Sequence, residues 1–441
     1  MHQLPLLRDL NLDADVLGRE PASRTLLRAA TLLPEPSCLA LYGAWGTGKT
    51  TMLRKLGDDW ERQSRGPVVW FDPWEHEQRS DVISPLLHAI VEHVRTHKSV
   101  DQDRLQRVAV EIAKALAALS VKAAAKYLFG ASKETAIGTS LDDFKAAFSE
   151  WSKYHSEVEE TKKNFSALVE LTLGGRSTST LLVLVDDLDR CMPDNVVAML
   201  EGMKLLLCAR TTARVLFVCA LDRSVVGDAI SKRYPSSRRY SGEHYLEKIF
   251  DASVEVPPVP LPVIAEYVHS LWARQLAPLV EKLYAPVGGS QVVASVLAEP
   301  NFANPRVIKR VLNRLVLLVS EADAADRVRH WPEADVRRLL VWIAGAERFR
   351  SFRSAFVDAS DAEIRSLCLR MEGEPVEEGS LGPNLFAAVS LPGFSAYYHG
   401  LGLAGRPPDA VLRERADGDE RPADCAVSLR EIDGLLRGYG L

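Results

Sequence analysis

The stretch GAWGTGKTT, residues 43–51, decides the fold of this sequence. It follows the aliphatic run CLALYG (38–43) and fits the spacing G-x-x-x-x-G-K-[ST]. Glycines at this spacing let backbone N–H groups turn inward around phosphate oxygens, and a helix that begins at Lys49 adds the positive end of its dipole. Lys49 would then reach the β- and γ-phosphates of a nucleotide, and the hydroxyl of Thr50 would bind Mg²⁺. The pattern predicts a phosphate-binding loop between a strand and a helix.

The residues after the loop support this interpretation. Apolar side chains recur on one helical face, at Met52, Leu53, Leu56 and Trp60. The loop is therefore expected to bind ATP together with Mg²⁺. The expected nucleotide-binding residues are Gly43, Trp45, Gly46, Gly48, Lys49, Thr50 and Thr51.

Composition and charge restrict the class of protein. The chain has 441 residues, of which 47% are hydrophobic, enough for one large domain or two to three ordinary domains, each with its own core. A net charge of −5 argues against binding nucleic acid over the whole surface. The six cysteines form no C-x-x-C pair, so neither a zinc site nor a disulfide framework is expected. Charged residues interrupt the most apolar segment, 108–130, so we expect no membrane span and a cytoplasmic protein.

Short apolar runs alternate with helical patterns over the first 255 or so residues, which is typical of an α/β fold with a parallel sheet. Each run is continuous rather than alternating, as expected where helices cover both faces of the sheet. The predicted strands are CLALYG (38–43), PVVWFD (67–72), LLVLVD (181–186), RVLFVCA (214–220) and ASVEVP (252–257).

The predicted domain organisation has three parts. Residues 1–258 form a P-loop NTPase domain that carries a long helical insertion at about 105–172. Residues 259–350 form a helical lid or sensor domain, and residues 351–441 form a mixed, largely helical region. Within that last region, 405–425 is polar and rich in proline and glycine, which is typical of a linker.

A second motif, LLVLVDDLDRC (181–191), places aspartates directly after an aliphatic run. This is the Walker B arrangement, in which the first acid completes the Mg²⁺ site. Asp186 is therefore the predicted metal-side carboxylate, and Asp187 could polarise the water that attacks the γ-phosphate. Asp189 and Arg190 could read the phosphate state or meet a neighbouring subunit. Alternatively, Asp187 and Asp189 are acids at a helix N-terminus without a chemical role.

Together these motifs resemble the KAP P-loop NTPases. The resemblance spans roughly residues 40–315 and depends on several elements in a fixed order. They are GAWGTGKT (43–50), WFDPWEHE (70–77), DDLDRC (186–191), VCALDRSVV (218–226), YLEKIFD (245–251) and NPRVIKRVLN (304–313).

This resemblance implies the STAND-like, additional-strand branch of P-loop ATPases, with strand order 5-1-4-3-2. Family members are thought to couple nucleotide state to assembly or signalling, and many bacterial ones look like parts of defence loci. Two features depart from the family. A charged helical insertion stands where transmembrane helices are often found, and Asp72–Pro73 stands where asparagine–alanine is common.

Several other residues are candidates for the site, and most of them also have a purely structural interpretation. Asp222 could sense the γ-phosphate or cap the helix that follows it. Arg306 and Arg310 share a helical face and could close a lid over the phosphates, or they are surface charges. Trp45 and Trp74 could cover the nucleotide mouth, although packing in the core is the simpler interpretation. Glu75 is a candidate auxiliary base.

The motifs thus predict an ATP-hydrolysing molecular switch. The resemblance implies that it forms a homo-oligomer or binds partner proteins from the same locus, as part of an anti-phage defence system. Its catalytic candidates are Lys49, Asp187, Asp189, Asp222 and Arg306. An interaction scaffold that binds nucleotide without turnover is the first alternative. A DNA-handling ATPase is another, which the acidic net charge disfavours.

Overall fold

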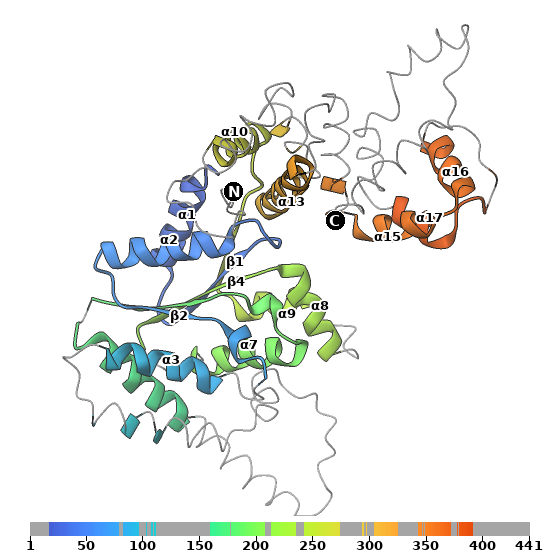
Figure 1. Ribbon diagram of the computed structural model, residues 1–441. Coiled ribbons are helices and arrows are strands. Elements are labelled where there is room, and N and C mark those ends of the chain that lie inside the picture. Colours follow the sequence, from blue (N-terminus) through green and yellow to red (C-terminus); the bar gives the residue numbers. More distant parts are fainter. Residues whose placement is uncertain are drawn as a thin grey trace, which may run out of the picture. The chain divides into compact units, whose positions relative to one another are not determined.

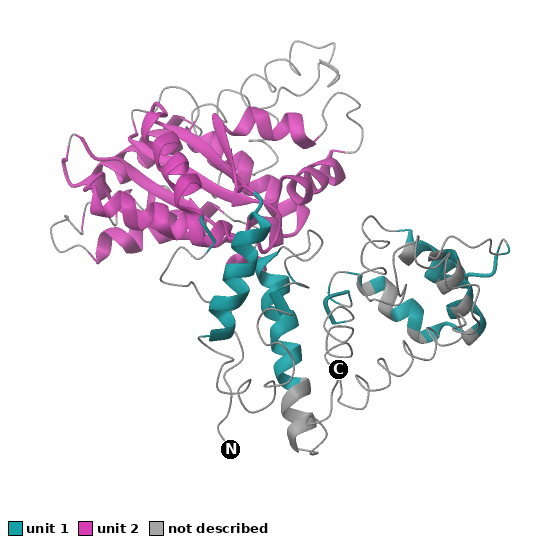
Figure 2. Ribbon diagram, turned by 90° about the horizontal axis from the view of Figure 1, so that it is seen from above, with its two compact units in different colours: residues 1–18, 258–441 teal, residues 19–257 magenta. Residues whose placement is uncertain are grey.

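The computed structural model describes the part of the chain from residue 17 to residue 390, with gaps. The described ranges are 17–78, 83–96, 159–176, 178–207, 213–234, 242–273, 304–324, 349–371 and 379–390, with a few single positions between them. The chain divides into two compact units (Figure 2). One is Arg19–Pro257, and the other combines Met1–Gly18 with Pro258–Leu441.

The first unit is built on a parallel sheet of five strands in the order β2-β3-β4-β1-β5 (Figure 1). This is the predicted order read from the opposite edge, so the α/β prediction and the strand order are confirmed. The strands are β1 Ser37–Tyr42, β2 Val68–Phe71, β3 Leu181–Val185, β4 Val215–Leu221 and β5 Ala252–Glu255. Because all strand pairs are parallel, the residues that follow β1, β2, β3 and β4 meet at one edge of the sheet.

Helices cover both faces of the sheet, with α1 and α2 on one side and α3 and α7 on the other (Figure 1). In β3, for example, Leu182 and Leu184 pack in the core on the α1–α2 side, while Leu181, Val183 and Val185 pack in the core on the opposite side. A strand buried on both faces needs apolar residues at every position, which explains the continuous runs in the sequence.

The two outer strands differ from this expectation. Side chains of β5 alternate between partly buried and exposed, and Trp70 of β2 is 37% exposed. An edge strand has a neighbour on one side alone, so its helix cover is incomplete. The prediction that every strand is buried on both faces is therefore wrong for β2 and β5.

The helices and turns of this unit precede, connect or follow the strands. They are α1 Glu20–Leu32, α2 Lys49–Arg62, the 3₁₀ turn η1 Pro73–His76, α3 Ile83–Arg95, the 3₁₀ turn η2 Leu188–Arg190, α7 Pro193–Leu207, α8 Arg223–Arg233 and α9 Gly242–Ile249. Of the predicted helical insertion, residues 159–173 are helical, with Phe165 and Leu168 fully buried. Residues 112–158 lie outside the described residues.

The described elements of the second unit are all helices. They are α10 Leu261–Leu271, α13 Pro305–Ala324, α15 Arg350–Asp358, α16 Asp361–Met371 and α17 Pro383–Val389. The predicted polar linker 405–425 lies outside the described residues, and the three-part division of the chain stays a prediction. Across the described ranges, no helix combines the length and the apolar character that crossing a membrane requires.

Candidate nucleotide-binding site

The phosphate-binding loop connects β1 to α2, and its shape depends on its glycines. Gly46 and Gly48 have φ angles of 82° and 99°, which side-chain-bearing residues rarely adopt, and Gly48 is the N-cap of α2. Gly43 lies so close to the residue after β5 that a Cβ on it would stand 3.0 Å from Val256 Cγ2. Thr50 and Thr51 follow in the first turn of the helix. The chain thus forms the strand–loop–helix geometry in which backbone N–H groups can converge on an anion.

Lys49 turns its side chain back across this loop and is buried. Its Nζ donates to the carbonyls of Gly43 (2.9 Å) and Ala44 (3.4 Å) and to Asp189 Oδ2 (3.1 Å). A lysine ammonium has three N–H donors, and here three protein acceptors lie within reach of them. To donate to a phosphate oxygen, the Lys49 ammonium would therefore have to give up its hydrogen bond to one of these acceptors.

Asp189 connects the two motifs, although its sequence position gave no hint of this contact. Its Oδ2 accepts from Lys49 Nζ and also from the backbone N–H of Asp222 (2.9 Å), and its side chain is 6% exposed. One carboxylate oxygen thus joins the phosphate loop, the turn η2 and the end of β4. Asp189 is 140 positions from Lys49 and 33 positions from Asp222 in the sequence, so the sheet order alone brings these residues together.

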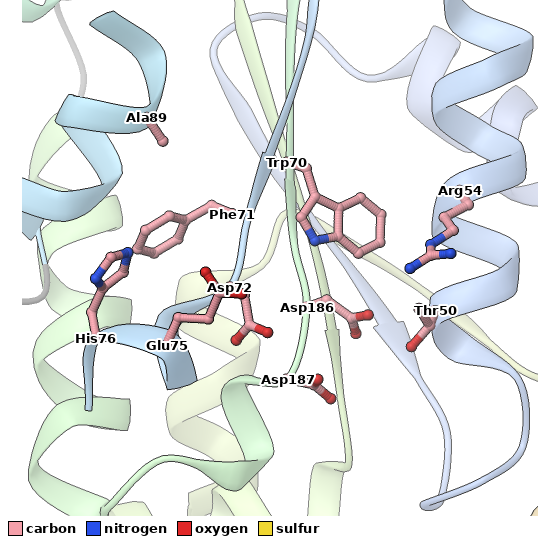
Figure 3. Close-up of a pocket in the computed structure, with 10 residues that line it drawn as sticks. All are labelled: Thr50, Arg54, Trp70, Phe71, Asp72, Glu75, His76, Ala89, Asp186 and Asp187. Carbon is pink, nitrogen blue, oxygen red and sulfur yellow. The ribbon is translucent and has the colours of Figure 1, made fainter. Parts of the chain in front are cut away.

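A cavity of about 310 Å³ lies at the ends of β2 and β3, where Thr50 of α2 also lines it (Figure 3). Thr50 of α2 and Asp186 at the end of β3 both line it, and their side chains face one another. Asp187, Asp72 and Glu75 also line it. The remaining lining residues are Arg54, Trp70, Phe71, His76 and Ala89.

Asp186 fits the metal-side role predicted for it. Its residue is 3% exposed, and its Oδ1 atom is buried without a hydrogen-bond donor among the described residues. A buried carboxylate oxygen without a partner is costly unless a cation or donor satisfies it. No group of three or more His, Cys, Asp or Glu residues with metal-binding geometry occurs in the described ranges. A hydroxyl, one carboxylate and nucleotide phosphates are the usual donors for Mg²⁺, so Thr50 and Asp186 suit this ion.

Asp187 begins the turn η2 in a left-handed conformation, with φ 55° and ψ 21°, which aspartate tolerates better than most residues. Its Oδ1 forms an ion pair with Arg190 Nη2 at 2.9 Å. Burial and the neighbouring charge of Asp186 raise the pKa of Asp187 to about 6, and Arg190 opposes this shift. The cavity thus places a second carboxylate directly beside the metal-side one.

Asp72 is the residue whose part in the site the sequence left open. Asp72 lies next to the end of β3, because Phe71, the residue before it, pairs with Val185 in the sheet. Asp72 Oδ1 accepts from the N–H of Trp74 (2.9 Å) and thereby caps η1. Burial raises the pKa of the Asp72 carboxyl, and the nearby carboxylates add to the effect. An edge strand therefore contributes a further acid to the cavity.

The prediction that Trp45 and Trp74 pack in the core is wrong. Trp45 is 55% exposed and Trp74 is 48% exposed. The guanidinium of Arg190 lies over the ring of Trp74, 5.3 Å from its centroid. Arg54 lies over the ring of Trp70 in the same way, at 5.6 Å. Of these residues, Arg54 and Trp70 line the acidic cavity, and Arg190 connects Trp74 to the cavity residue Asp187.

The hydrogen bonds of Asp222 bear on the two roles that the sequence allowed for it. Its Oδ1 accepts from the N–H of Ser224 (3.0 Å), from the hydroxyl of Ser224 (2.7 Å) and from the N–H of Val225 (3.5 Å). This is the hydrogen-bond pattern of a helix N-cap, at the start of α8. The side chain carries the capping role, and its phosphate-sensing role stays a prediction.

The candidate lid arginines belong to the second unit. Arg306 stands in the first turn of α13, where its N–H donates to the side chain of Asn304 (2.9 Å). Arg310 forms an ion pair with the buried carboxylate of Glu347 at 3.7 Å, which Arg314 also contacts at 2.6 Å. Arg310 therefore has a structural partner in its own unit. The lid role of both arginines stays a prediction.

Arg19 is a contact residue of the loop that sequence reasoning missed. It is 7% exposed and donates to the carbonyls of Thr47 (Nη2, 3.0 Å) and Pro257 (Nη1). It lies outside all the motifs quoted above. No spacing in the sequence reveals an arginine that binds backbone carbonyls 28 and 238 residues away.

Comparison with solved structures gives distant similarities. The chain is similar to Cdc6p from Pyrobaculum aerophilum, with 14% identity, a TM-score of 0.40, and coverage of 98% of this chain and 97% of that one. It is also similar to the ORC2 protein of Aeropyrum pernix, with 13% identity, a TM-score of 0.37, and coverage of 99% and 96%. A Walker-type ATPase of Pyrococcus abyssi gives 12% identity, a TM-score of 0.32, and coverage of 96% and 99%.

A comparison with curated protein sequences gives no match. The comparison with protein families is decisive, because residues 24–322 match the family described as the KAP family P-loop domain. The matched region contains β1 to β5, the phosphate-binding loop and the aspartates of β3 and η2. By its sheet order, its phosphate loop and this match over more than half of its length, the chain belongs to the KAP family of P-loop NTPases.

Proposed function

We propose that this protein is a Mg²⁺-dependent ATPase that works as a slow molecular switch. The observation that carries the proposal is the cavity lined jointly by Thr50, Asp186 and Asp187, together with the buried Lys49 that directly precedes Thr50 in the chain. A hydroxyl, an unpartnered buried carboxylate, a second carboxylate and a lysine are the groups that phosphoryl transfer to water requires.

Each residue has a distinct part in the proposed reaction. Lys49 leaves one of its protein acceptors and neutralises charge on the β- and γ-phosphates. The N–H groups of the loop between Gly43 and Lys49 hold the phosphate oxygens in place. Thr50 and Asp186 would hold Mg²⁺, which supplies further neutralisation of the phosphate charge. Asp187 accepts a hydrogen bond from the attacking water and orients it in line with the leaving group.

The proposal includes coupling of nucleotide state to assembly, as family membership suggests. Arg190 and Arg306 are the candidates for reading the phosphate state, and partners would be further copies of this chain or proteins of the same locus. An anti-phage role is the finer form of this proposal. Phage challenge of cells that carry the locus with wild-type or Lys49→Ala protein tests it, and equal protection by both would contradict it.

Three variants test the catalytic assignment. Lys49→Ala should abolish measurable ATP binding or turnover, because it removes the ammonium that neutralises the phosphates. Asp186→Asn should lower Mg²⁺-dependent binding and hydrolysis together. Asp187→Asn should bind ATP nearly normally while turnover falls by about 10²-fold or more, the usual scale of a general base. Nucleotide affinity and single-turnover rate are measured on each variant.

The outcomes separate the assignments. Wild-type hydrolysis by Lys49→Ala would contradict the phosphate-loop assignment. Normal turnover by Asp187→Asn would leave Asp187 as a turn-forming acid and move the water-orienting role to Asp189 or Glu75.

A second candidate is a scaffold that binds nucleotide without turnover. The ion pair between Asp187 Oδ1 and Arg190 favours it, because this pairing occupies one of the two oxygens that could orient water. A wild-type protein that binds ATP but shows no single-turnover hydrolysis would support the scaffold. Its ATP affinity should still depend on Lys49.

A further inference from the structure

Arg19 lies at a position from which it can control the shape of the phosphate loop. It is the residue before α1, it is 7% exposed, and its side chain makes no capping hydrogen bond to α1. Its guanidinium instead donates from Nη2 to the carbonyl of Thr47 at 3.0 Å and from Nη1 to the carbonyl of Pro257. A charged group is buried at a cost that the hydrogen bonds to these carbonyls help to offset.

The Thr47 carbonyl belongs to the peptide group whose orientation matters for binding phosphate. In a trans peptide, the C=O of one residue and the N–H of the next point in opposite directions. If the Thr47 carbonyl points at Arg19, the N–H of Gly48 points away from Arg19. Reversal of this peptide would put a carbonyl where an anion requires an N–H group.

Glycines at positive φ stand on both sides of Thr47, at Gly46 and Gly48, and glycine opposes backbone rotation less than any other residue. Thr47 is anchored through its N–H and its hydroxyl, which both donate to the carbonyl of Ala44 (3.4 and 2.7 Å). Neither bond involves the Thr47 carbonyl, which is the atom that Arg19 holds.

The same guanidinium contacts the end of the nucleotide-binding unit. Arg19 is the first residue of that unit and Pro257 is its last, so the chain passes to the second unit next to each of them. Val256, which precedes Pro257, donates its N–H to the carbonyl of Tyr42 (2.7 Å) and packs against Gly43. The phosphate loop is thus tied to the exit of β5 both through Val256 and through Arg19.

We propose that Arg19 is a positioning residue that keeps the Thr47–Gly48 peptide in its phosphate-binding orientation and links it to the points where the chain leaves this unit. The proposal rests on the proposed function, because it assigns Arg19 a part in binding ATP. A phosphate held by the N–H of Gly48 fixes the Thr47 carbonyl on Arg19, and Arg19 in turn holds Pro257. ATP binding should therefore make the segment after β5 more rigid.

The test combines ATP affinity with hydrogen exchange of peptides that cover residues 252–260, measured on the full chain with Mg²⁺ and with or without ATP. In the wild-type protein, ATP should slow exchange in the phosphate loop and in 252–260. Arg19→Ala should weaken ATP binding about tenfold, the scale of one hydrogen bond from a charged donor. At saturating ATP it should keep the response of the loop and lose the response of 252–260.

Two further variants make the result specific. Arg24→Ala is the matched control, because Arg24 is an exposed α1 residue that pairs with Glu20 at 3.8 Å, and it should leave affinity and exchange unchanged. Arg19→Lys keeps the charge but lacks the fork that can hold two carbonyls at once. It should bind ATP severalfold more weakly and also lose the response of 252–260, and it decides the question if Arg19→Ala does not fold.

Wild-type affinity together with a wild-type exchange response in either Arg19 variant would overturn the proposal. So would a variant with weaker binding whose 252–260 segment still responds to saturating ATP. A wild-type protein that fails to bind ATP in a Lys49-dependent manner would overturn the proposed function as well. That outcome is visible without any Arg19 variant, so the two failures are distinguishable.

Discussion

Replacing Asp189 by asparagine should tighten ATP binding, although Asp189 contacts the lysine of the phosphate loop. Asp189 Oδ2 is 3.1 Å from Lys49 Nζ, and both side chains are largely buried, at 6% and 8% exposure. Asp189 therefore competes with a phosphate for the ammonium. Asparagine has the same size and keeps one oxygen acceptor for the N–H of Asp222, but it removes the negative charge.

The magnitude follows from the contact. Coulomb's law at 3.1 Å with an effective dielectric constant of about 20 gives an attraction of about 5 kcal/mol. Desolvation of both charges opposes much of it, so the net contribution should be about 1.5–3 kcal/mol, the range of hydrogen bonds to charged groups. The variant should lose this free energy of unfolding without nucleotide. ATP phosphates restore a negative partner to Lys49, so affinity should rise by about 10- to 100-fold.

Thermal unfolding with and without Mg²⁺–ATP, combined with an ATP titration, measures both quantities on one protein. Asp194→Asn is the matched control, because Asp194 is an exposed acid on α7 that pairs with Arg233 at 3.2 Å and should not affect ATP binding. If Asp189→Asn binds ATP no better and unfolds like the wild type but turns over more slowly, the reasoning is refuted. Asp189 would then act on the attacking water.

Two further predictions concern the backbone and a buried acid. Gly48→Ala should cost about 1–2 kcal/mol of stability and weaken ATP binding, because φ is 99° while no atom would contact the new Cβ. Gly174→Ala, also at positive φ (58°) with open space around it, should lose stability but bind ATP normally, and titrations that show equal affinities for both would contradict this. Glu201 accepts from the hydroxyls of Tyr234 (2.6 Å) and Tyr245 (2.9 Å), and burial raises its pKa, so the folded state binds its proton more tightly than the unfolded state does. The free energy of unfolding should therefore fall as pH rises from the ordinary glutamate pKa, and Glu201→Gln should flatten this pH dependence in denaturant titrations.

The parts of the site that lie within one motif were predictable from the sequence. Lys49 and Thr50 begin a helix after a glycine loop, and Asp186 directly follows a buried strand, because local spacing decides these positions. The role of Asp222 was left between two readings. Its side chain caps α8, and that choice depends on where the chain turns after β4. Core packing of Trp45 was wrong, because a large apolar side chain in a loop carries no periodicity that could report its burial.

By itself, the sequence determined the α/β class, the phosphate loop and the aspartates that follow β3. These depend on the period of apolar residues and on glycine spacing, which are properties of a few consecutive residues. The tertiary structure alone decided that Asp189 holds Lys49, that Asp72 enters the cavity, and that Arg19 binds the carbonyls of Thr47 and Pro257. Each of these contacts joins separate segments of the chain. They depend on strand order and register, which place residues far apart in the sequence at one edge of the sheet.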